Sequence, residues 1–207
     1  EQSGTIGSCA QDAARRFKAI PADRSRQKPL IGIVGEIFVR SNRFSNDFII
    51  ERIEQCGGEV VMPTLQEWVS YTDWERRKDF RREGPLSRFL LELFKGGIQS
   101  REVKKIKKAF TGTIPHFFSE PATAEVMHLC GPYLPEDIRG EATLSMGRCV
   151  EYAQHGCHGI VNVIPFNCMP GTIVNTLLCR FARDYPHLPI LKMVYDGTRQ
   201  SGDHTRI

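Results

Sequence analysis

Short apolar runs alternate with amphipathic segments in the first part of the sequence. Leu30–Gly35 is a continuous apolar, β-branched run that ends in glycine, which is typical of a buried parallel strand. Apolar residues then recur at helical spacing from Ile49 to Cys56, and Gly57-Gly58 ends that helix. Glu59–Pro63 follows as a second strand. Strand, helix and strand in this order predict a βαβ unit.

The same alternation returns near the end of the sequence. We predict a helix from Glu141 to Gln154, a strand over Gly159–Ile164 and a turn over Pro165–Gly171. A helix over Thr172–Arg183 and a strand over Leu188–Val194 complete the pattern. The predicted fold class is therefore α/β, an open Rossmann-like parallel sheet of about four strands. Sheets of this kind bind ligands at the carboxyl ends of their strands.

The segment between these two parts contains no convincing strand. We interpret residues 64–135 as a helical insertion in a domain that spans residues 29–207, because the segment is too long for a plain loop. The segment includes an apolar helical stretch at Leu86–Leu93 and a basic one at Ser100–Phe110, with a further helix over 121–129. Residues 1–28 are interpreted as a leader or linker, with a short helix over Gln11–Ile20, and we expect the sequence to belong to a longer protein.

Charge and composition argue against a nucleic-acid-binding protein, a membrane protein and a disulfide-rich protein. The net charge is +4, and most of the excess lies in residues 76–82 and 101–108. No nucleic-acid recognition motif accompanies these basic stretches, so we expect solvated faces and no nucleic-acid partner. No apolar run is long enough to span a bilayer, so we expect no membrane partner. Seven cysteines, an odd number, argue against a full disulfide framework and favour reduced thiols and a cytoplasmic location.

The segment around Cys168 carries the most chemical information. It lies in the predicted turn between a buried strand and a helix, and Pro165 and Pro170 stiffen it on both sides. Pro170 suits the first turn of a helix, which places Cys168 at or just before the helix N-terminus. The free N–H groups there stabilise a thiolate, an anionic iron–sulfur cluster or a phosphate. A small apolar side chain that fills a tight turn is the alternative interpretation.

The other cysteines give weaker signals. Cys130 precedes Gly131-Pro132 at the end of the predicted insertion, and we expect it in a loop, where it could be a ligand. Cys149 and Cys179 lie within predicted helices among apolar neighbours, and Cys56 lies near a helix end. For all three, packing is the better interpretation. The sequence has no Cys-x-x-Cys pair, so an iron–sulfur cluster would need ligands that only the fold brings together.

Charged and polar residues follow several of the predicted strands. Arg40 and Arg43 flank two polar residues, and together these four side chains could hold a phosphate or a carboxylate. A solvated polar loop is the alternative interpretation. Each acidic residue could bind a ligand, or could act only as a helix cap or a surface charge. The candidate ligand-binding residues are Glu36, Arg40, Ser41, Asn42, Glu141 and Asp196. No catalytic residue is assigned. The sequence contains no Gly-x-Gly-x-x-Gly, Walker A, Gly-x-Ser-x-Gly or His-Glu-x-x-His motif.

Several of these segments, in this order, resemble the 2-hydroxyglutaryl-CoA dehydratase D-component family. The resemblance covers residues 29–207 and is strongest to the branch found in large CoA-substrate-specific enzyme activases and in double-cubane-cluster proteins. The segments that carry it are Ile31–Asn42 with Phe44, Gly140-Glu141 with Gly147, Pro165–Thr172, Tyr195-Asp196-Gly197 and Thr205-Arg206.

The resemblance implies a Rossmann-like protein of anaerobic metabolism that holds an iron–sulfur cluster through dispersed cysteines. Cys168 matches the family's Pro-Phe-x-Cys-Met-Pro motif, and Cys130 is a looser match. A partner ATPase activase domain or subunit reduces the cluster in such systems, and the electron then passes to a 2-hydroxyacyl-CoA. The Gly-rich phosphate loops of that ATPase are missing from this sequence, and relatives are longer, so the cluster could be incomplete here.

Three functions follow as hypotheses. The first is an iron–sulfur electron-transfer module of an activase or a dehydratase-like system. The second is a non-catalytic domain that binds an acyl-CoA or another phosphate-bearing ligand. The third is an interaction domain of a large activase, in which Trp68 and Trp74 dock onto the ATPase part. Homodimer formation is left open.

Overall fold

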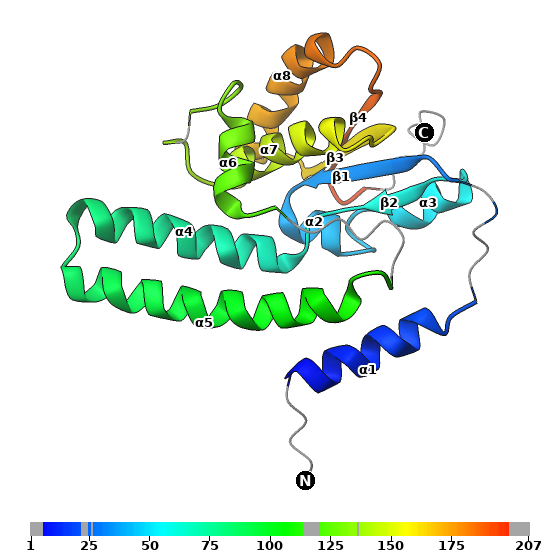
Figure 1. Ribbon diagram of the computed structural model, residues 1–207. Coiled ribbons are helices and arrows are strands. Elements are labelled where there is room, and N and C mark those ends of the chain that lie inside the picture. Colours follow the sequence, from blue (N-terminus) through cyan, green and yellow to red (C-terminus); the bar gives the residue numbers. More distant parts are fainter. Residues whose placement is uncertain (1–5, 22–24, 26, 114–120, 136, 199–207) are drawn as a thin grey trace. The chain divides into compact units, whose positions relative to one another are not determined.

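The computed structural model describes residues 6–21, 25, 27–113, 121–135 and 137–198 (Figure 1). Its contacts divide the chain into two compact units. One contains residues 1–26 and 66–121, and the other contains residues 27–65 and 122–207. We call them the helical unit and the sheet unit. The helical unit thus includes N-terminal residues that the sequence analysis assigned to a leader, as well as most of the expected insertion.

The helical unit is built from α1 (Ile6–Lys18), α4 (Leu65–Glu83) and α5 (Leu86–Phe110). Where the sequence predicted two separate helical stretches, α5 is one continuous helix of 25 residues. The helix continues through Gly96. This residue lies directly against the guanidinium group of Arg77 on α4. A Cβ atom at position 96 would require the flexible end of the Arg77 side chain to move.

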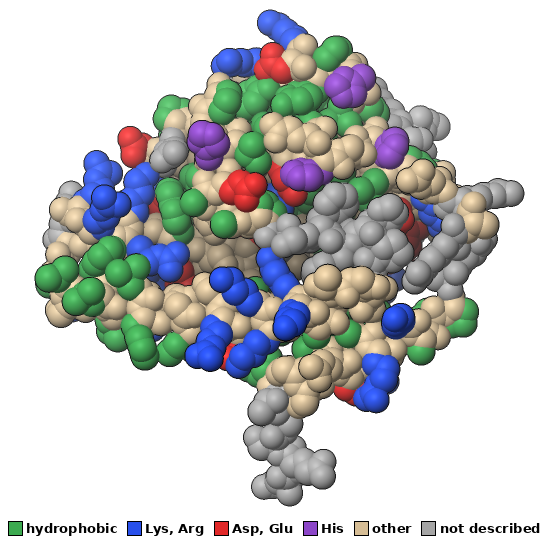
Figure 2. Space-filling view, in the orientation of Figure 1, with side chains coloured by type: hydrophobic (Ala, Val, Ile, Leu, Met, Phe, Trp, Pro, Cys, Tyr) green, Lys and Arg blue, Asp and Glu red, His purple; other side chains and the backbone are tan. Residues whose placement is uncertain are grey.

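An aromatic contact joins α1 to the C-terminal end of α5. The rings of Phe17 on α1 and Phe110 on α5 meet edge to face, with their centroids 6.0 Å apart. The first half of α5 leaves large apolar side chains exposed, and Lys and Arg side chains gather along the rest of the helix (Figure 2). The exposed apolar residues of that half are Leu86, Leu90, Leu91, Leu93, Phe94 and Ile98.

The sheet unit contains four parallel strands in the order β2-β1-β3-β4. The strands are β1 (Leu30–Gly35), β2 (Glu59–Val61), β3 (Gly159–Pro165) and β4 (Ile190–Tyr195). Every residue of β3 except the last is buried, as expected for a central strand covered on both faces. The predicted fold class, an open α/β sheet of Rossmann-like type, is confirmed.

Five helices of the sheet unit pack around these strands. Their bounds are α2 (Ile37–Ser41), α3 (Ile49–Gln55), α6 (Thr123–Cys130), α7 (Glu141–Gln154) and α8 (Met169–Asp184). Helices α7 and α8 contact each other and the central strands, and α6 packs on α7. Helix α3 packs beside the edge strand β2.

Alternation along the strands separates two packing surfaces. Side chains of one face form an apolar cluster with α3 that contains Ile33, Ile49, Ile53, Val161, Val163 and Met193. On the other face, the ring of Tyr152 from α7 lies against Gly32, and Gly171 of α8 lies against Ile164. Both glycines sit where a Cβ atom would overlap these side chains, so they allow the helices to approach the sheet closely.

Some predicted bounds were wrong by a few residues. Helix α8 begins at Met169 rather than at Thr172, because Cys168 already acts as its N-cap and Pro170 fits its first turn. Strand β2 ends at Val61 instead of Pro63. Residues 37–41, which the sequence analysis placed partly in a polar loop, form the short helix α2. In the described part of the chain, no helix is both long enough and apolar enough to cross a membrane.

Candidate functional site at the carboxyl edge of the sheet

The strand order places a topological switch point between β1 and β3. The chain runs from β1 outward to β2 and then returns to the other side of β1 as β3. Loops after two such strands lead in opposite directions, and this divergence creates the usual ligand crevice of open α/β sheets. Glu36 follows β1, and the Pro165–Cys168 segment follows β3. The structure therefore brings these two predicted features to the same edge of the sheet.

The end of β1 is held tightly against β3. Gly35 has a φ angle of 112°, and a Cβ atom there would overlap the backbone oxygen of Val163. The next residue, Glu36, donates its backbone N–H to that same oxygen at 2.9 Å. Glycine at position 35 thus permits the strand to turn directly into α2.

Two glutamates share the N-terminus of α2. The side chain of Glu36 is the N-cap of this helix and accepts the Val39 N–H at 2.7 Å. Glu141, the first residue of α7, accepts the Ile37 N–H through Oε1 at 2.9 Å. Both predicted residues therefore lie at the edge, and each has a structural role as a cap.

The surroundings of Glu141 disfavour its charged form. Burial is the largest cause that raises the pKa of Glu141 above its usual 4.5, and the nearby Glu36 raises it further. The hydrogen bond from Ile37 and the charge of Arg40 act in the opposite direction. A half-buried carboxyl with a raised pKa can hold a proton more readily than an exposed one, which suits it to donate a hydrogen bond or a proton.

The arginine predicted to hold an anion is not available at the surface. The Arg40 side chain is 4% exposed, and its charge acts on Glu141. Asn42 caps the C-terminal end of α2, and its Oδ1 accepts the Ser45 N–H at 3.0 Å. Of the three predicted polar residues here, Ser41 alone is exposed, at the last position of α2.

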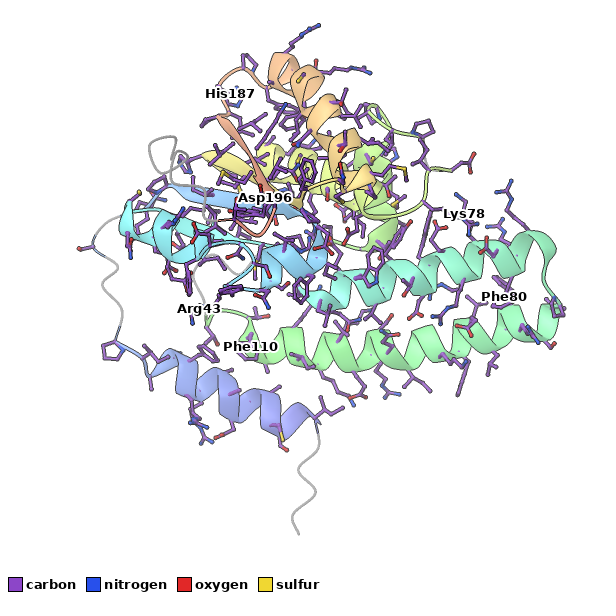
Figure 3. The ribbon with its side chains drawn as sticks, turned by 180° about the vertical axis from the view of Figure 1, so that it is seen from behind. Arg43, Lys78, Phe80, Phe110, His187 and Asp196 are labelled. Atoms are coloured by element: carbon purple, nitrogen blue, oxygen red, sulfur yellow. The ribbon has the colours of Figure 1, made fainter. Side chains whose placement is uncertain are left out.

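The second arginine, Arg43, also has partners close by in the chain. Arg43 forms an ion pair with Glu51 of α3 at 2.5 Å, and its guanidinium lies 5.6 Å from the centre of the Phe48 ring. Figure 3 marks its position beside α3. A phosphate clamp made of two arginines, as the sequence suggested, would require both side chains to leave these surroundings.

Cys168 lies where the sequence predicted, at the N-terminus of α8. Its Sγ accepts the Gly171 N–H at 3.4 Å, and its backbone oxygen accepts the Thr172 N–H at 2.9 Å. The residue is partly exposed. The sulfur thus accepts an amide hydrogen at the positive end of the α8 dipole.

Large apolar side chains surround this cysteine in the sequence and remain exposed. Phe166 and Met169 are 65% and 72% exposed. Asn167 between them has a φ angle of 60°, a left-handed conformation that asparagine tolerates better than most residues. Phe38 of α2, from the neighbouring loop of the switch point, is 61% exposed. The edge therefore combines a thiol, two carboxylates and an apolar rim.

Asp196, labelled in Figure 3, follows the end of β4. In the sheet, β3 lies between β4 and β1, the strand that Glu36 follows. The Oδ1 of Asp196 accepts hydrogen bonds from the backbone N–H and the side-chain hydroxyl of Thr198, at 2.8 and 2.6 Å. These bonds lower the pKa of this exposed carboxyl. Asp196 thus organises the turn after β4 through this oxygen.

Cys130, the second cysteine candidate, lies in a different environment from Cys168. It is the last residue of α6, is 1% exposed, and its Sγ lies 3.8 Å from the Leu134 oxygen. It also raises the pKa of Cys149 on α7, although burial is the larger cause of that increase. The cysteine expected in a loop is therefore packed at the α6–α7 contact.

The donor set can be tested against an iron–sulfur cluster. Within the described ranges, no three His, Cys, Asp or Glu side chains come together as metal ligands. Cys168 fits one position of such a cluster, because this residue is partly exposed and its sulfur lies at a helix N-terminus. The residues that the structure describes thus supply one suitable thiol at the edge.

One buried polar residue near the edge was missed by the sequence analysis. Asn162 in β3 is fully buried, and its Nδ2 donates to Oδ1 of Asn175 on α8 at 2.9 Å. Its own Oδ1 lies beside Gly35 and has no partner among the described residues. A polar side chain inside an otherwise apolar strand was the signal that could have revealed it.

Comparisons with known proteins do not decide the family. No family model, curated protein or solved structure matches this chain.

Proposed function

We propose that the sheet unit is an iron–sulfur electron-transfer module that supplies Cys168 as one cluster ligand. The system would be a CoA-substrate-specific enzyme activase or a 2-hydroxyacyl-CoA dehydratase-like enzyme, and an ATPase activase domain or subunit would deliver the electron. The observation that carries the proposal is the position of Cys168, a partly exposed cysteine at the N-terminus of α8 and at the topological switch point. The resemblance in the Pro165–Thr172 segment supports the same role.

The proposal includes a second source of ligands. A cluster normally takes four cysteine ligands, whereas the described edge offers Cys168 and no group of three ligands. We therefore propose that a partner chain, or a second copy of this chain, completes the cluster. The bound cluster would supply one-electron redox chemistry, and α8 would offset its negative charge through the N-terminal N–H groups.

Anaerobic reconstitution with iron and sulfide tests this function. We expect iron, acid-labile sulfide and a broad visible absorption band in the wild-type protein, and the loss of all three in Cys168→Ala. Cys149→Ala, which removes a buried thiol, and Cys56→Ser, which removes an exposed one, should both retain iron. Equal iron content in all four proteins would refute the proposal, because the metal would then bind without Cys168.

A second candidate function is the binding of an acyl-CoA without chemistry. The exposed apolar rim of Phe38, Phe166 and Met169 favours it, since an acyl chain could cover these side chains. The thermal unfolding midpoint of metal-free protein should rise with an acyl-CoA and rise less with CoA alone. Phe166→Ala should reduce the difference between the two ligands. An unchanged midpoint at millimolar acyl-CoA would count against this function.

The third hypothesis, docking through tryptophans of the helical unit, receives less support. Trp68 and Trp74 are half-buried, and both pack against Tyr71 of their own helix, with ring centroids 5.5 and 6.5 Å from it. Lys78 also lies over the Trp74 ring, at 5.1 Å from its centroid. These rings already have partners within α4.

A further inference from the structure

A thiol and an amine from two different elements meet on the surface of the sheet unit. Cys179 lies on α8 and Lys192 on β4, and both side chains are exposed. The Lys192 Nζ lies 3.1 Å from the Cys179 Sγ. This contact joins residues 13 positions apart, and nothing in the sequence indicated it.

A shared acceptor fixes this pair. The Lys192 Nζ donates to the backbone oxygen of Asn175 at 2.7 Å, and the Cys179 Sγ donates to the same oxygen at 3.6 Å. That oxygen already lies one turn before Cys179 on α8, so the helix itself sets the position of both groups. The amine is therefore held over the sulfur rather than extended into solvent.

The arrangement favours one oxidative reaction. A thiol that is exposed reacts with peroxides to give a sulfenic acid, and a sulfenic acid condenses with a neighbouring nitrogen to give a sulfenamide. The nitrogen nearest to this sulfur belongs to a primary amine that is already in contact with it. Short distance and fixed orientation make such an intramolecular step much faster than the reaction with a separate amine.

We propose that peroxide oxidation joins Cys179 to Lys192 through a reversible Sγ–Nζ bond. In the first step the sulfur attacks an oxygen of hydrogen peroxide. The S–O bond forms, the O–O bond breaks, and one water leaves. In the second step the amine of Lys192, after losing its proton to solvent, attacks the sulfur. The S–O bond breaks and the hydroxyl leaves as a second water. One thiol, one amine and one peroxide thus give one sulfenamide and two waters, and the sulfur is oxidised by two electrons.

The cross-link would have a mechanical consequence for the sheet unit. Cys179 and Lys192 connect α8 to β4, and the N-terminus of the same helix carries Cys168. A covalent bond at this position would fix the helix on the sheet. The inference rests on the geometry of this pair alone and is independent of the proposed cluster.

Mass spectrometry of the full chain after treatment with hydrogen peroxide tests the inference. We expect the peptides that contain Cys179 and Lys192 to be joined, with a mass two hydrogens below their sum, and trypsin to be blocked after Lys192. A thiol reductant should restore the two separate peptides. A joined species that retains an oxygen atom would overturn the assignment of a direct S–N bond.

Three variants make the test specific. Lys192→Arg keeps a positive charge near the sulfur but removes the primary amine, so the cross-link should disappear and dimedone should trap a sulfenic acid at Cys179. Cys179→Ser should abolish both the cross-link and the adduct. Cys56→Ser, which removes another exposed thiol, should leave the cross-link yield unchanged. The proposal fails if the wild-type Cys179 is oxidised to sulfinic acid or to an intermolecular disulfide while Lys192 stays unmodified.

Discussion

Glu141, at the start of α7, accepts a hydrogen bond from the backbone amide of Ile37, the first residue of α2, over a distance of 2.9 Å. These residues are 104 positions apart in the sequence. The bond therefore ties the helix that follows β1 to a helix that packs on the sheet. It also places a second carboxylate beside Glu36 at the switch point.

The first prediction concerns the pH dependence of stability at Glu141. Because the folded-state pKa is raised above 4.5, the folded protein retains a proton that the unfolded chain releases. This residue's contribution to stability is thus greatest below pH 4.5 and decreases as the pH rises through the raised folded-state pKa. Glu141→Gln keeps an acceptor for the Ile37 N–H and should remove this decrease. Urea unfolding of both proteins across that pH range measures it.

Glu141→Ala serves as the comparison for that prediction. It removes the acceptor and should lower the free energy of unfolding by about 1–2 kcal/mol at neutral pH, because the Ile37 N–H loses its partner. If Gln and Ala variants lose the same stability, the hydrogen bond has no measurable role.

The second prediction concerns the turn at Gly35. Gly35→Ala should lower the free energy of unfolding by about 3 kcal/mol or more, since the methyl group would overlap the Val163 oxygen at an unfavourable φ angle. Gly156→Ala is the matched control, because Gly156 also has a positive φ, of 79°, but has no atom within 4 Å of the added Cβ. We expect the control to lose only about 1–2 kcal/mol from backbone strain. Equal losses would show that the contact with β3 is unimportant.

The third prediction separates two roles of Cys168. As an N-cap it stabilises α8, and serine performs this role at least as well. Cys168→Ser should therefore unfold at the wild-type temperature or above, whereas Cys168→Ala should lose about 1 kcal/mol. Both variants should lack reconstituted iron if the thiol is a ligand. If Cys168→Ser retains iron and only the less stable Cys168→Ala loses it, the cysteine has a purely structural role.

The fourth prediction concerns the order in which thiols react with iodoacetamide. Exposed Cys56 and Cys179 should be alkylated first in the folded protein, while Cys149 and Cys157 should react only on unfolding. Burial raises the pKa of the Cys157 thiol to about 12, and the charge of Glu151 adds to this effect. Cys157 should therefore stay unmodified in the folded protein while Cys56 is alkylated, because Cys157 is buried and little of it is thiolate at neutral pH. Mass spectrometry of samples taken at successive times measures the alkylation of each cysteine. Modification of Cys149 or Cys157 before Cys56 would contradict the prediction.

The position of Cys168 could be predicted from a few neighbouring residues. Two prolines and the end of a buried strand were enough to place it at a helix N-terminus, because caps and first-turn prolines act over three or four positions. The strands were predictable for the same reason, since continuous apolar runs identify buried parallel strands. For the strands, the errors lay at the ends of the elements. The helices were predicted less well, since the short helix α2 was placed partly in a loop and α5 was predicted as two separate stretches.

The environment of the other candidates could not be predicted. Arg40 was expected at the surface, but packing at the start of α2 buries it near Glu141. Cys130 was expected in a loop, but α6 extends to include it and packs it on α7. Burial of a side chain depends on which distant element covers it, and no local pattern specifies that element.

The sequence by itself determined the alternation of strands and helices, the parallel sheet and the cap at Cys168, because periodicity and capping are properties of short segments. Only the tertiary structure decided that Glu36 and Glu141 share one helix N-terminus and that Cys179 touches Lys192. These pairs arise from the way helices pack on the sheet, which brings together residues that are far apart in the chain and whose types alone do not mark them as partners.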